Sequence, residues 1–406
     1  MKLGLIGKKL PYSYSKVIHN AFGYDYEIKE LQEDGFDSFM QDLPFDAFNI
    51  TIPYKEKVIP YINVLSDAAR VVNAVNTVVK KEGKLYGYNT DIFGLTAALK
   101  RSKIPIKGEK VLIFGGGGAS KAAQFVCKTE GAEEIIVMTR TGTPNFNDLA
   151  NYKNSTVIIN ATPVGTYPDN GKRLVDIGNF NSLKGVFDMI YNPAITDLLF
   201  QAKAKGAAYA NGLFMLISQA SYAKDLFFNT PHDGNCENKV YADLAFKATN
   251  IVLIGMPSTG KSTVGRHLSR ILDVNFIDTD NEIEKKEGKS IPEIFEQRGE
   301  AYFRGLERSV VDEVSKERGQ VIATGGGAPL FFDNYFKLKQ NGILIHLTRP
   351  PETVTRRGRP LLTDTEAFNR LYAERMPKYA AIADFTISNT TPPFVTAKRI
   401  TDLLNK

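Results

Sequence analysis

One stretch of the sequence, Gly255–Ser262, has the residue types and the spacing that suit the binding of phosphate groups. Its glycines allow backbone N–H groups to surround phosphate oxygens, and the helix predicted after it points its positive end at them. The Lys261 ammonium can reach the outer phosphates, and the Ser262 hydroxyl can ligate Mg²⁺. Because the apolar run at 251–254 predicts a strand directly before it, we interpret the stretch as a phosphate loop for ATP or GTP rather than a chance turn. The predicted contacts are Gly255, Ser258, Thr259, Gly260, Lys261, Ser262 and Thr263.

Charged side chains follow this loop at positions that phosphoryl transfer can use. Asp278 and Asp280 stand two residues apart at the end of a predicted strand. A turn with helix caps would explain such a pair on its own. Next to a phosphate loop, however, one acid can serve the Mg²⁺ shell and the other can lie near the acceptor hydroxyl. Arg304 is predicted on a helix beside aromatic residues, and arginine is the preferred group for bidentate carboxylate binding.

Further segments of this region bear on the same chemistry. Gly325–Gly327 follows a predicted strand and leaves a bare backbone that a ligand can approach closely. The basic loop around Arg359 is either a solvated charge run or a lid that brings positive charge onto phosphates and excludes water. Arg375 is predicted on a helix after that loop. His346 lies inside another predicted strand, where we expect a core residue.

Near the N-terminus, four polar clusters lie at predicted loop positions. They contain Ser13, Ser15, Thr51, Lys55, Asn76 and Asp91. The serine pair could cap a helix or present two hydroxyls to a polyol, and the local sequence alone favours the cap. Lys55, at the end of a strand predicted over 47–55, would on its own be a solvated surface group. The segment Asn89–Asp91 could cap the helix predicted over 92–99. Four such clusters in one segment nevertheless favour one binding site over four unrelated caps.

A second glycine-rich turn, Gly115–Ser120, follows the apolar run at 110–114 and precedes a predicted helix. In this arrangement a helix N-terminus receives the pyrophosphate of a dinucleotide. The next predicted strand, 134–138, comes at the distance that a βαβ unit requires. An acid after it would favour NAD, whereas Arg140 with two hydroxyls suits a 2′-phosphate, so we predict NADP(H). The predicted contacts are Gly115, Gly116, Gly117, Gly118, Ala119, Ser120, Thr139, Arg140 and Thr141.

The polar clusters of the first part resemble the shikimate dehydrogenase family. The resemblance is carried by Ser13–Ser15 with His19-Asn20, Asn49–Lys55, Ala74–Thr77 and Gly87–Asp91. It implies that Lys55 and Asp91 form the catalytic pair. Reduction of a ketone needs a hydride at carbon and a proton at oxygen, and a lysine held by a carboxylate can donate that proton.

The same resemblance implies roles for other residues of this site. The implied substrate contacts are Ser13, Ser15, Thr51, Asn76, Tyr191 and Gln219. The stretch 211–220 is similar to the family segment that touches the nicotinamide, which implies a cofactor contact at Gly212. Phe214 and Met215 within it are expected in the core rather than at the cofactor. The chain departs from the family at Lys16, where proline is usual, and at Thr139, where asparagine is usual.

Residues 250–406 resemble the shikimate kinase family along their whole length. The resemblance implies that Asp278 serves Mg²⁺ together with Ser262, that Asp280 meets the shikimate hydroxyl, and that Lys261 acts on the ATP phosphates. The implied remaining contacts are Arg304 and Arg375 on the substrate carboxylate, Gly326 and Gly327 lining the site, and Arg359 as the lid arginine on ATP. The segment 388–393 departs from the family because it lacks an arginine that many relatives have.

Length and composition bound these interpretations. The chain has 406 residues, which suggests two or three domains, and its net charge of +6 suits anionic small molecules more than nucleic acid or a membrane. The two cysteines, Cys127 and Cys236, form no CxxC pair, which favours a reducing compartment without structural zinc. We find no signal peptide and no apolar run long enough to span a membrane, so we expect a cytoplasmic protein.

We therefore predict an α/β protein built of two enzymes. An α/β substrate domain at 1–100, completed by 212–248, surrounds a Rossmann NADP-binding domain at 101–211, and a P-loop kinase domain with a parallel sheet follows at 249–406. The expected function is NADPH-dependent reduction of 3-dehydroshikimate to shikimate, followed by Mg²⁺- and ATP-dependent phosphorylation of shikimate to shikimate 3-phosphate. The alternative is a quinate/shikimate-type polyol dehydrogenase fused to a regulatory nucleotide-binding module. Small molecules are the expected partners, and a homo-oligomer is left open.

Overall fold

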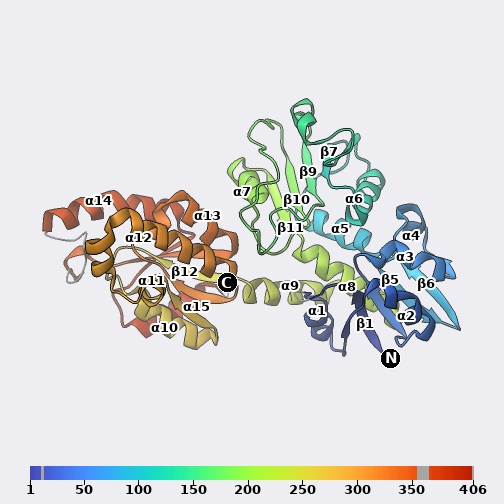
Figure 1. The fold of residues 1–406 in the computed structure, drawn as a ribbon, viewed down its shortest axis with the longest axis horizontal. Helices are drawn as coiled ribbons and strands as arrows, with labels where there is room; N and C mark the ends of the chain where they lie inside the picture. Colours follow the sequence, from blue (N-terminus) through green and yellow to red (C-terminus); the bar gives the residue numbers. More distant parts are fainter. Residues whose placement is uncertain (11–12, 354–364, 405–406) are drawn as a thin grey trace. The chain divides into compact units, whose positions relative to one another are not determined.

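Short apolar segments form the strands of three β-sheets (Figure 1). The structure, a computed structural model, describes residues 1–10, 13–353 and 365–404. The chain divides into two units, Met1–Leu244 and Ala245–Lys406. The first unit holds two of the sheets and the second unit holds the third. This agrees with the α/β class predicted from the sequence.

The first sheet has six strands in the order β2-β1-β3-β5-β6-β4. Its strands are β1 (Leu3–Gly7), β2 (Glu27–Glu30), β3 (Ala47–Ile50), β4 (Val64–Leu65), β5 (Thr77–Lys81) and β6 (Lys84–Tyr88). The helices that accompany it are α1 (Ser15–Ala21), η1 (Glu33–Gly35), α2 (Phe36–Asp42), α3 (Tyr54–Lys57), η2 (Ile59–Tyr61), α4 (Asp67–Val72) and α5 (Thr90–Arg101). β1 pairs in parallel with β2 and β3, whereas β5 runs antiparallel to β3 and β6. The parallel part brings the ends of β1 and β3 to one edge.

The second sheet is fully parallel, in the order β11-β10-β9-β7-β8. It contains β7 (Lys110–Phe114), β8 (Glu134–Met138), β9 (Val157–Asn160), β10 (Gly185–Asp188) and β11 (Ala208–Asn211), with α6 (Gly118–Thr129), η3 (Phe146–Tyr152) and α7 (Asp197–Ala204). The strand order reverses beside β7, and open α/β sheets bind ligands at such a switch point. The glycine-rich turn predicted to bind a dinucleotide directly follows β7.

After the second sheet the chain returns to the first along α8 (Leu213–Phe228) and continues into α9 (Asn235–Lys247). α8 packs closely on α5: a Cβ added at Gly94 would lie 2.4 Å from the backbone oxygen of Met215. The buried Phe214 and Met215 belong to the core there, which agrees with their expected place.

The sheet of the second unit is also parallel, in the order β13-β14-β12-β15-β16. Its strands are β12 (Asn250–Ile254), β13 (Asn275–Asp278), β14 (Gln320–Ala323), β15 (Gly342–Thr348) and β16 (Phe385–Ser388). Its helices are α10 (Lys261–Leu272), α11 (Thr279–Glu287), α12 (Ile291–Lys316), η4 (Ala328–Leu330), α13 (Phe332–Asn341), η5 (Pro351–Thr353), α14 (Thr365–Ile382) and α15 (Pro393–Leu404).

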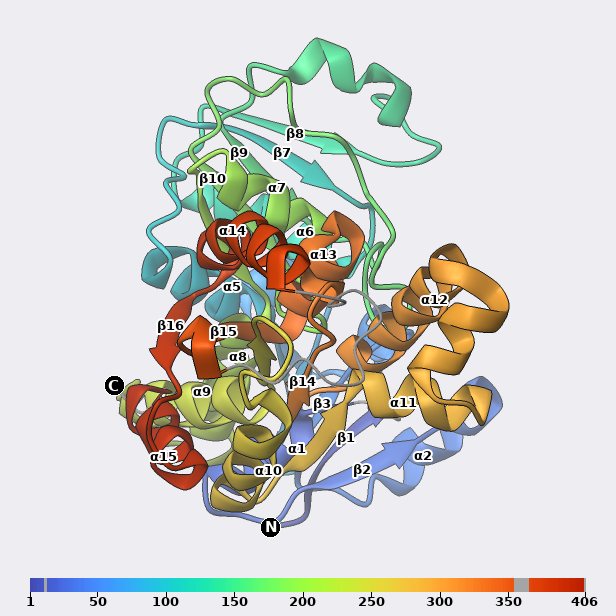
Figure 2. The ribbon, with the colours of Figure 1, turned by 90° about the vertical axis from the view of Figure 1, so that its left-hand side faces the viewer.

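Residues of β12 alternate between two cores, one on each face of this sheet. Val252 and Ile254 pack with side chains of α12, α13 and α14, and Ile251 and Leu253 pack with those of α10 and α15. Figures 1 and 2 show these helices on the two faces. A strand buried on both faces reads as one continuous apolar run, which is why the sequence predicts it clearly.

One predicted element differs from the structure. The strand expected over 47–55 ends at Ile50, and Lys55 lies instead on the short helix α3. Pro53 is the residue before that helix; it has no N–H to continue a strand ladder. Within the described ranges, no helix combines the length and the apolar character needed to cross a membrane.

Candidate active sites of the two units

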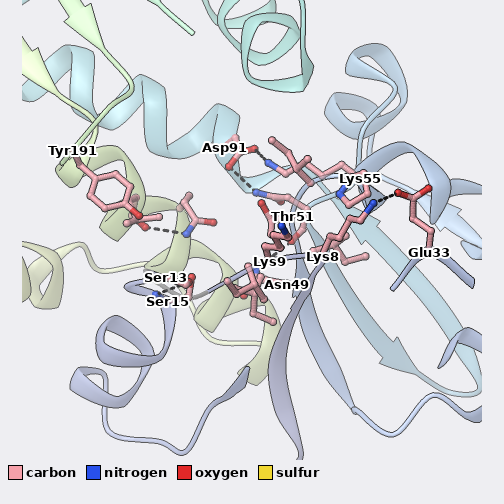
Figure 3. A pocket seen from close by; sticks show the side chains of 18 residues that line it. Lys8, Lys9, Ser13, Ser15, Glu33, Asn49, Thr51, Lys55, Asp91 and Tyr191 are labelled. Atoms are coloured by element: carbon pink, nitrogen blue, oxygen red, sulfur yellow. Dashed lines mark hydrogen bonds and ion pairs between the residues drawn. The ribbon is translucent and has the colours of Figure 1, made fainter. Parts of the chain in front are cut away.

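The first unit contains a cavity of about 670 Å³ at the carboxyl ends of β1 and β3 (Figure 3). Lys8 and Lys9 directly follow β1, and Thr51 directly follows β3. The polar and charged side chains that line it are Lys8, Lys9, Ser13, Ser15, Glu33, Asn49, Thr51, Lys55, Asn76, Asp91, Tyr191 and Gln219. The cavity therefore brings together the predicted catalytic pair and every predicted substrate contact. Lys8, Lys9, Glu33 and Asn49 were not predicted.

Lys55 and Asp91 contact each other at this cavity. The Lys55 Nζ donates to Asp91 Oδ2 at 2.6 Å, and Asn76 Nδ2 donates to the other carboxylate oxygen at 2.9 Å. The two side chains of the pair are 20% and 14% exposed. Because both carboxylate oxygens are engaged, the carboxylate is fixed in orientation and holds the ammonium in place. Such an ammonium can donate a proton to an oxygen that gains negative charge.

A buried network holds Asn76 in turn. The Thr90 N–H donates to Asn76 Oδ1 at 2.7 Å, and Asn49 Nδ2 donates to the Asn76 carbonyl at 3.2 Å. The Tyr26 hydroxyl donates to Asn49 Oδ1 at 2.6 Å. Asn89 precedes α5, but its amide donates to the Ala74 carbonyl rather than to the helix. The interpretation of Asn89–Asp91 as a mere helix cap is therefore wrong.

The other predicted substrate contacts reach the cavity from separate elements. Ser13 Oγ accepts from the Ser15 N–H at 3.3 Å, so this hydroxyl supports the turn before α1 while it also lines the cavity. Gln219, on α8, accepts from the Thr90 hydroxyl at 3.1 Å. The Tyr191 ring lies 5.6 Å from that of Tyr14, centroid to centroid. Sequence spacing alone could not join these elements, since Ser15 and Gln219 are far apart in the chain.

The glycine-rich turn fits a dinucleotide. Gly115 has a φ of +116°, and an added Cβ would lie 2.8 Å from the Ala161 carbonyl oxygen, so the turn requires glycine. No side chain caps the N-terminus of α6 at Gly117, and open space surrounds the Cβ positions of Gly117 and Gly118. Free N–H groups with room in front of them suit a pyrophosphate. Gly116 lies in this turn between Gly115 and Gly117.

A second cavity of about 500 Å³ adjoins the first. Ile52 and Tyr191 line both cavities, and Ala119 lines the second. The two cavities therefore share part of their walls. Beyond β8, Arg140 and Thr141 are exposed and Thr139 is half-buried, which leaves the guanidinium accessible to a 2′-phosphate.

Two predicted cofactor contacts, Ser120 and Gly212, are packed against other parts of the chain. The Ser120 side chain is fully buried in α6, and its hydroxyl accepts from Gln124 Nε2 at 3.3 Å. A Cβ at Gly212 would lie 2.0 Å from the Met189 carbonyl oxygen, so this position requires glycine for close backbone packing. Neither residue lines the two cavities.

In the second unit, the phosphate loop joins β12 to α10. Gly255 and Gly260 have φ values of +139° and +91°, which favour glycine. Ser258 shares this conformation with a φ of 62°. The buried Lys261 Nζ donates to the carbonyls of Gly255 and Met256 at 2.9 and 2.8 Å. The loop therefore fits the phosphate groups of ATP. Thr263 is exposed in the first turn of α10.

Asn389 fixes this loop from the distant end of the unit. Its Nδ2 donates to the Thr259 carbonyl at 2.8 Å, and its Oδ1 accepts from the Thr396 hydroxyl at 2.8 Å. A Cβ at Gly260 would lie 2.4 Å from the same Nδ2. The segment 388–393 thus supports the loop, a role that the sequence could not indicate because the contact spans 130 positions.

Ser262 and Asp278 provide oxygen ligands of the kind that Mg²⁺ prefers. The Ser262 hydroxyl donates to Asp278 Oδ2 at 2.5 Å, and Asp278 Oδ1 accepts from the Asp280 N–H at 3.1 Å as the cap of α11. The cap interpretation of the acid pair therefore holds for Asp278, and its role toward Mg²⁺ stays a prediction. The described residues contain no group of three or more His, Cys, Asp or Glu suited to a metal. Mg²⁺ bound with nucleotide phosphates needs only one or two carboxylates.

Arg304 lies beside the glycine triplet and a buried acid. Its Nη1 donates to both Glu307 oxygens at 3.1 and 2.9 Å, and its Nη2 donates to Glu300 at 2.9 Å. Glu307 is 1% exposed, and burial raises the pKa of its carboxyl while Arg304 opposes that shift. A Cβ at Gly327 would lie 2.8 Å from Arg304 Nη1, and one at Gly325 would lie 2.5 Å from Asp280 Oδ1. The bare glycine backbone thus makes room for the predicted acid and arginine.

Glu307 and Tyr379 also belong to this site, and the sequence did not indicate a role for either. Glu307 follows Arg304 by three helical positions, a spacing that could have indicated the pair. Tyr379 is fully buried, and its hydroxyl donates to the Gly326 carbonyl. Burial raises the pKa of Tyr379 to about 12, so it stays a donor. Arg375 lies close enough to lower the pKa of both Glu307 and Tyr379. It therefore lies near Glu307, the acid that pairs with Arg304.

The remaining predictions for this unit concern two residues. His346 is 1% exposed in β15, and burial, aided by Lys261, lowers the pKa of its imidazole to about 4. This neutral buried ring agrees with the expected core position. Arg359, the predicted lid arginine, lies outside the described residues.

Known proteins match the chain in two separate regions. A family model described as the shikimate dehydrogenase substrate binding domain matches residues 5–78. The shikimate dehydrogenase (NADP(+)) of Clostridium perfringens strain 13 is 33% identical over 267 residues, which cover 60% of this chain and 98% of the relative. That of Caldicellulosiruptor saccharolyticus is 36% identical over 257 residues, or 56% of this chain and 92% of the relative. The chain belongs to the shikimate dehydrogenase family.

Solved structures agree with membership in the shikimate dehydrogenase family. A chorismate mutase/shikimate 5-dehydrogenase fusion protein from Clostridium acetobutylicum matches with a TM-score of 0.56 and 32% identity, over 60% of this chain and 96% of that one. A 5-ketofructose reductase of Gluconobacter matches with a TM-score of 0.52 and 25% identity, over 60% of this chain and 98% of that one. The dehydrogenase fold therefore occurs in other fusions and with other carbonyl substrates.

This shikimate dehydrogenase carries a second enzyme domain. A family model described as shikimate kinase matches residues 257–405, which contain the phosphate loop from Pro257 onward, the acid pair and Arg304. The chain is therefore a bifunctional enzyme of the shikimate pathway, and the alternative of a regulatory nucleotide-binding module is not favoured.

Proposed function

We propose that the first unit reduces 3-dehydroshikimate to shikimate and that Lys55 and Asp91 are its catalytic residues. The observation that carries this proposal is the 2.6 Å contact between Lys55 and Asp91 at the cavity. NADPH, when bound, supplies the hydride to the carbonyl carbon. The Lys55 ammonium donates the proton to the carbonyl oxygen, and Asp91 holds that ammonium in position. Asn76 orients the carboxylate, and Ser13, Ser15, Thr51, Tyr191 and Gln219 position the substrate.

The second unit, in this proposal, transfers the γ-phosphate of ATP to the 3-hydroxyl of shikimate. The phosphate loop and Lys261 hold the ATP phosphates, and Mg²⁺, held by Ser262 and Asp278, would neutralise their charge. Asp280 lies near the acceptor hydroxyl and accepts its proton, while Arg304 and Arg375 bind the substrate carboxylate. The support comes from the contacts of Ser262 with Asp278 and of Arg304 with Glu307.

A coupled assay tests both activities at once. Purified protein receives 3-dehydroshikimate, NADPH and ATP with Mg²⁺, and we expect NADPH oxidation followed by formation of shikimate 3-phosphate. A lag before the second product shows that shikimate diffuses between the sites, which is our expectation. Oxidation of quinate without oxidation of shikimate would overturn the proposed dehydrogenase substrate.

Substitutions separate the two activities within one chain. We expect Asp91→Asn to lower the dehydrogenase kcat by roughly 10²–10⁴-fold, the range of general acid–base catalysis, and to leave kinase turnover unchanged. Asp280→Asn should abolish most phosphate transfer while the dehydrogenase stays active. In each variant the untouched activity reports that the protein is folded. Phosphate transfer at the wild-type rate in Asp280→Asn would refute the role given to that acid.

Two broader properties are also proposals. Cys127 and Cys236 are both free thiols, which supports a reducing compartment such as the cytoplasm. A homo-oligomer stays a prediction, and the mass of the purified protein in light scattering checks it.

A further inference from the structure

Another cavity of the first unit, of about 440 Å³, shares no lining residue with the two cavities of the dehydrogenase site. Its walls come from the C-terminal end of α4, from one face of α6 and from the edge strand β8. α4 accompanies the first sheet, whereas α6 and β8 belong to the second, so a ligand here would contact both parts of the unit. Small-molecule sites usually enclose about 300–1,000 Å³, which makes this space suitable for a compact ligand. None of its lining residues is a predicted substrate or cofactor contact.

The wall of this cavity is mainly apolar. Val71, on α4, is 69% exposed, and Phe125, Ile135 and Val137 are half-buried. Among the described residues, no aromatic ring packs against Phe125. A ligand with an aromatic ring would remove these apolar surfaces from water and would lie against Phe125 in an offset or edge-to-face arrangement. The wall therefore suits the apolar part of a small aromatic molecule.

The polar side chains at this cavity can all donate hydrogen bonds, and none of them is acidic. They are Asn73, Lys121, Gln124 and Lys128. The Lys121 Nζ donates to Glu56 Oε1 at 2.7 Å, whereas Lys128 has no acidic partner within the described ranges. Gln124 and Lys128 stand four positions apart on α6 and so share one face of that helix. One uncommitted ammonium with an amide beside it matches a single carboxylate.

We propose that this cavity between α4, α6 and β8 is a binding site for a small aromatic carboxylate. The ring of the ligand lies against Val71 and Phe125, and its carboxylate pairs with the Lys128 ammonium and accepts from the Gln124 amide. A neutral aromatic compound lacks the charge, and an aliphatic carboxylate lacks the ring, so the two features together select the ligand. The site goes beyond the proposed function, because no step of either reaction uses these residues.

Lys121 connects this cavity to the dehydrogenase site. It lines the cavity and pairs with Glu56, which directly follows the proposed catalytic residue Lys55 on α3. A bound carboxylate attracts Lys121 as well as Lys128, so it weakens the contact between α6 and α3. Lys55 is then held less firmly, and the dehydrogenase becomes slower. Coupling between two sites is reciprocal, so loss of the Glu56 carboxylate must also strengthen the binding of the ligand.

The test titrates 3-phenylpropanoate into the full chain by calorimetry. We expect binding that shikimate does not displace. Lys128→Gln should raise the dissociation constant by up to about fivefold at low ionic strength, the range of an exposed ion pair, and salt should reduce this difference. Lys128→Arg should retain the wild-type value, and neutral 3-phenylpropanamide should bind the wild type and Lys128→Gln alike. Val71→Asp places a carboxylate in the wall and should weaken the binding of 3-phenylpropanoate at least as much as Lys128→Gln.

Lys84→Gln is the matched control, since it removes an exposed lysine that does not line this cavity, and it should leave the dissociation constant unchanged. Absence of binding, displacement by shikimate, or equal affinity in the wild type, Lys128→Gln and Val71→Asp would overturn the site. Calorimetry needs no turnover, so it decides about the site even if the proposed dehydrogenase function fails.

Kinetics test the connection to α3. Saturating 3-phenylpropanoate should lower the kcat of shikimate oxidation by up to about fivefold in the wild type, because the exposed pair between Lys121 and Glu56 contributes no more than that. Glu56→Gln should bind the probe more tightly than the wild type does, and its kcat should no longer respond to the probe. Binding of the probe with an unchanged wild-type kcat would overturn the connection.

Discussion

At the level of single residues, the buried acid Glu307 holds an arginine of the second unit in place. Glu307 has almost no exposed surface and accepts from Arg304 through both oxygens, whereas Glu300, the second partner of Arg304, is 52% exposed. A charge pair gains strength from burial when its hydrogen bonds are complete. Glu307 therefore holds Arg304 beside the glycine triplet more firmly than Glu300 does.

We predict that Glu307→Gln raises the kinase KM for shikimate roughly tenfold, because loss of one charged hydrogen-bond partner costs on the order of 1.5 kcal/mol. Kinase kinetics at varied shikimate measure this. Glu300→Gln is the control and should change the KM less than twofold, since the pair it breaks is exposed. Equal effects of the two substitutions would contradict the greater importance of the buried acid.

Asp188 makes the stability of the first unit depend on pH. This side chain is fully buried and accepts from Thr196, Asn160 and the Ile190 N–H. Burial nevertheless raises the pKa of its carboxyl from 3.8 to about 6. The folded state therefore binds this proton more tightly than the unfolded state does. The resulting stability is present below pH 3.8 and is lost as the pH rises through about 6.

The expected size of this effect is on the order of 2–3 kcal/mol in the free energy of unfolding. Denaturant unfolding of the wild type and of Asp188→Asn across this pH range measures it. The difference between the two proteins isolates Asp188 from His19, whose pKa burial lowers to about 3 and whose effect on stability has the opposite sign. A difference that does not vary with pH would show that Asp188 has an ordinary pKa.

Motifs and a family resemblance predicted the acids and bases of both sites but not the residues that support them. Lys55 and Asp91 each have an ordinary local explanation, and only the resemblance to a known family implied that they form a pair. Asn49 and Asn389 look like ordinary polar residues in the sequence. Their roles depend on hydrogen bonds to segments that only the fold brings near. Hydrogen bonds between residues far apart in the chain are therefore what the sequence could not reveal.

At the scale of elements, the close contact between α5 and α8 aligns the dehydrogenase site. α5 carries Thr90 and Asp91 in its first turn, and α8 carries Gln219, which contacts Thr90. Gly94 lies where the two helices meet, and the atom nearest to its added Cβ belongs to the α8 backbone. A backbone atom cannot change rotamer to make room, so a larger residue at position 94 must push the two helices apart.

We predict that Gly94→Ala lowers the free energy of unfolding by about 1–3 kcal/mol, as overpacking does, and also lowers dehydrogenase kcat/KM. Thermal unfolding and shikimate kinetics measure the two effects. Gly305→Ala is the matched control, because it lies in α12 with open space at its Cβ. Alanine there should stabilise the helix by about 0.5–1 kcal/mol. A neutral Gly94→Ala would show that the helices tolerate a wider spacing.

Element boundaries followed from the sequence where a strand was a short apolar run between polar or glycine residues. The strand predicted at 134–138 coincides with β8, and the run at 110–114 coincides with β7. The helix α3 was missed because it has only four residues, too few for a helical pattern to appear. The order of strands within each sheet also required the structure, since pairing partners are not adjacent in the sequence.

At the scale of the whole molecule, the first unit has two sheets, the second has one, and each unit has its own hydrophobic cores. Units with separate cores unfold as separate cooperative transitions. We predict two transitions in calorimetry. NADPH should raise the midpoint of one and ATP with Mg²⁺ the midpoint of the other, because a ligand stabilises only the unit that binds it. A single transition that responds to either ligand would contradict independent units.

The helix α9 carries the chain from the first unit into the second without a break. One consequence concerns the cell rather than the fold. Every ribosome that completes this chain delivers one copy of each catalyst, so gene expression cannot alter their ratio. Flux through the two steps can then be matched only by the turnover numbers and Michaelis constants written into each unit. Selection on this protein must therefore match the catalytic rates of the two units, whereas two separate genes could match the amounts of two enzymes.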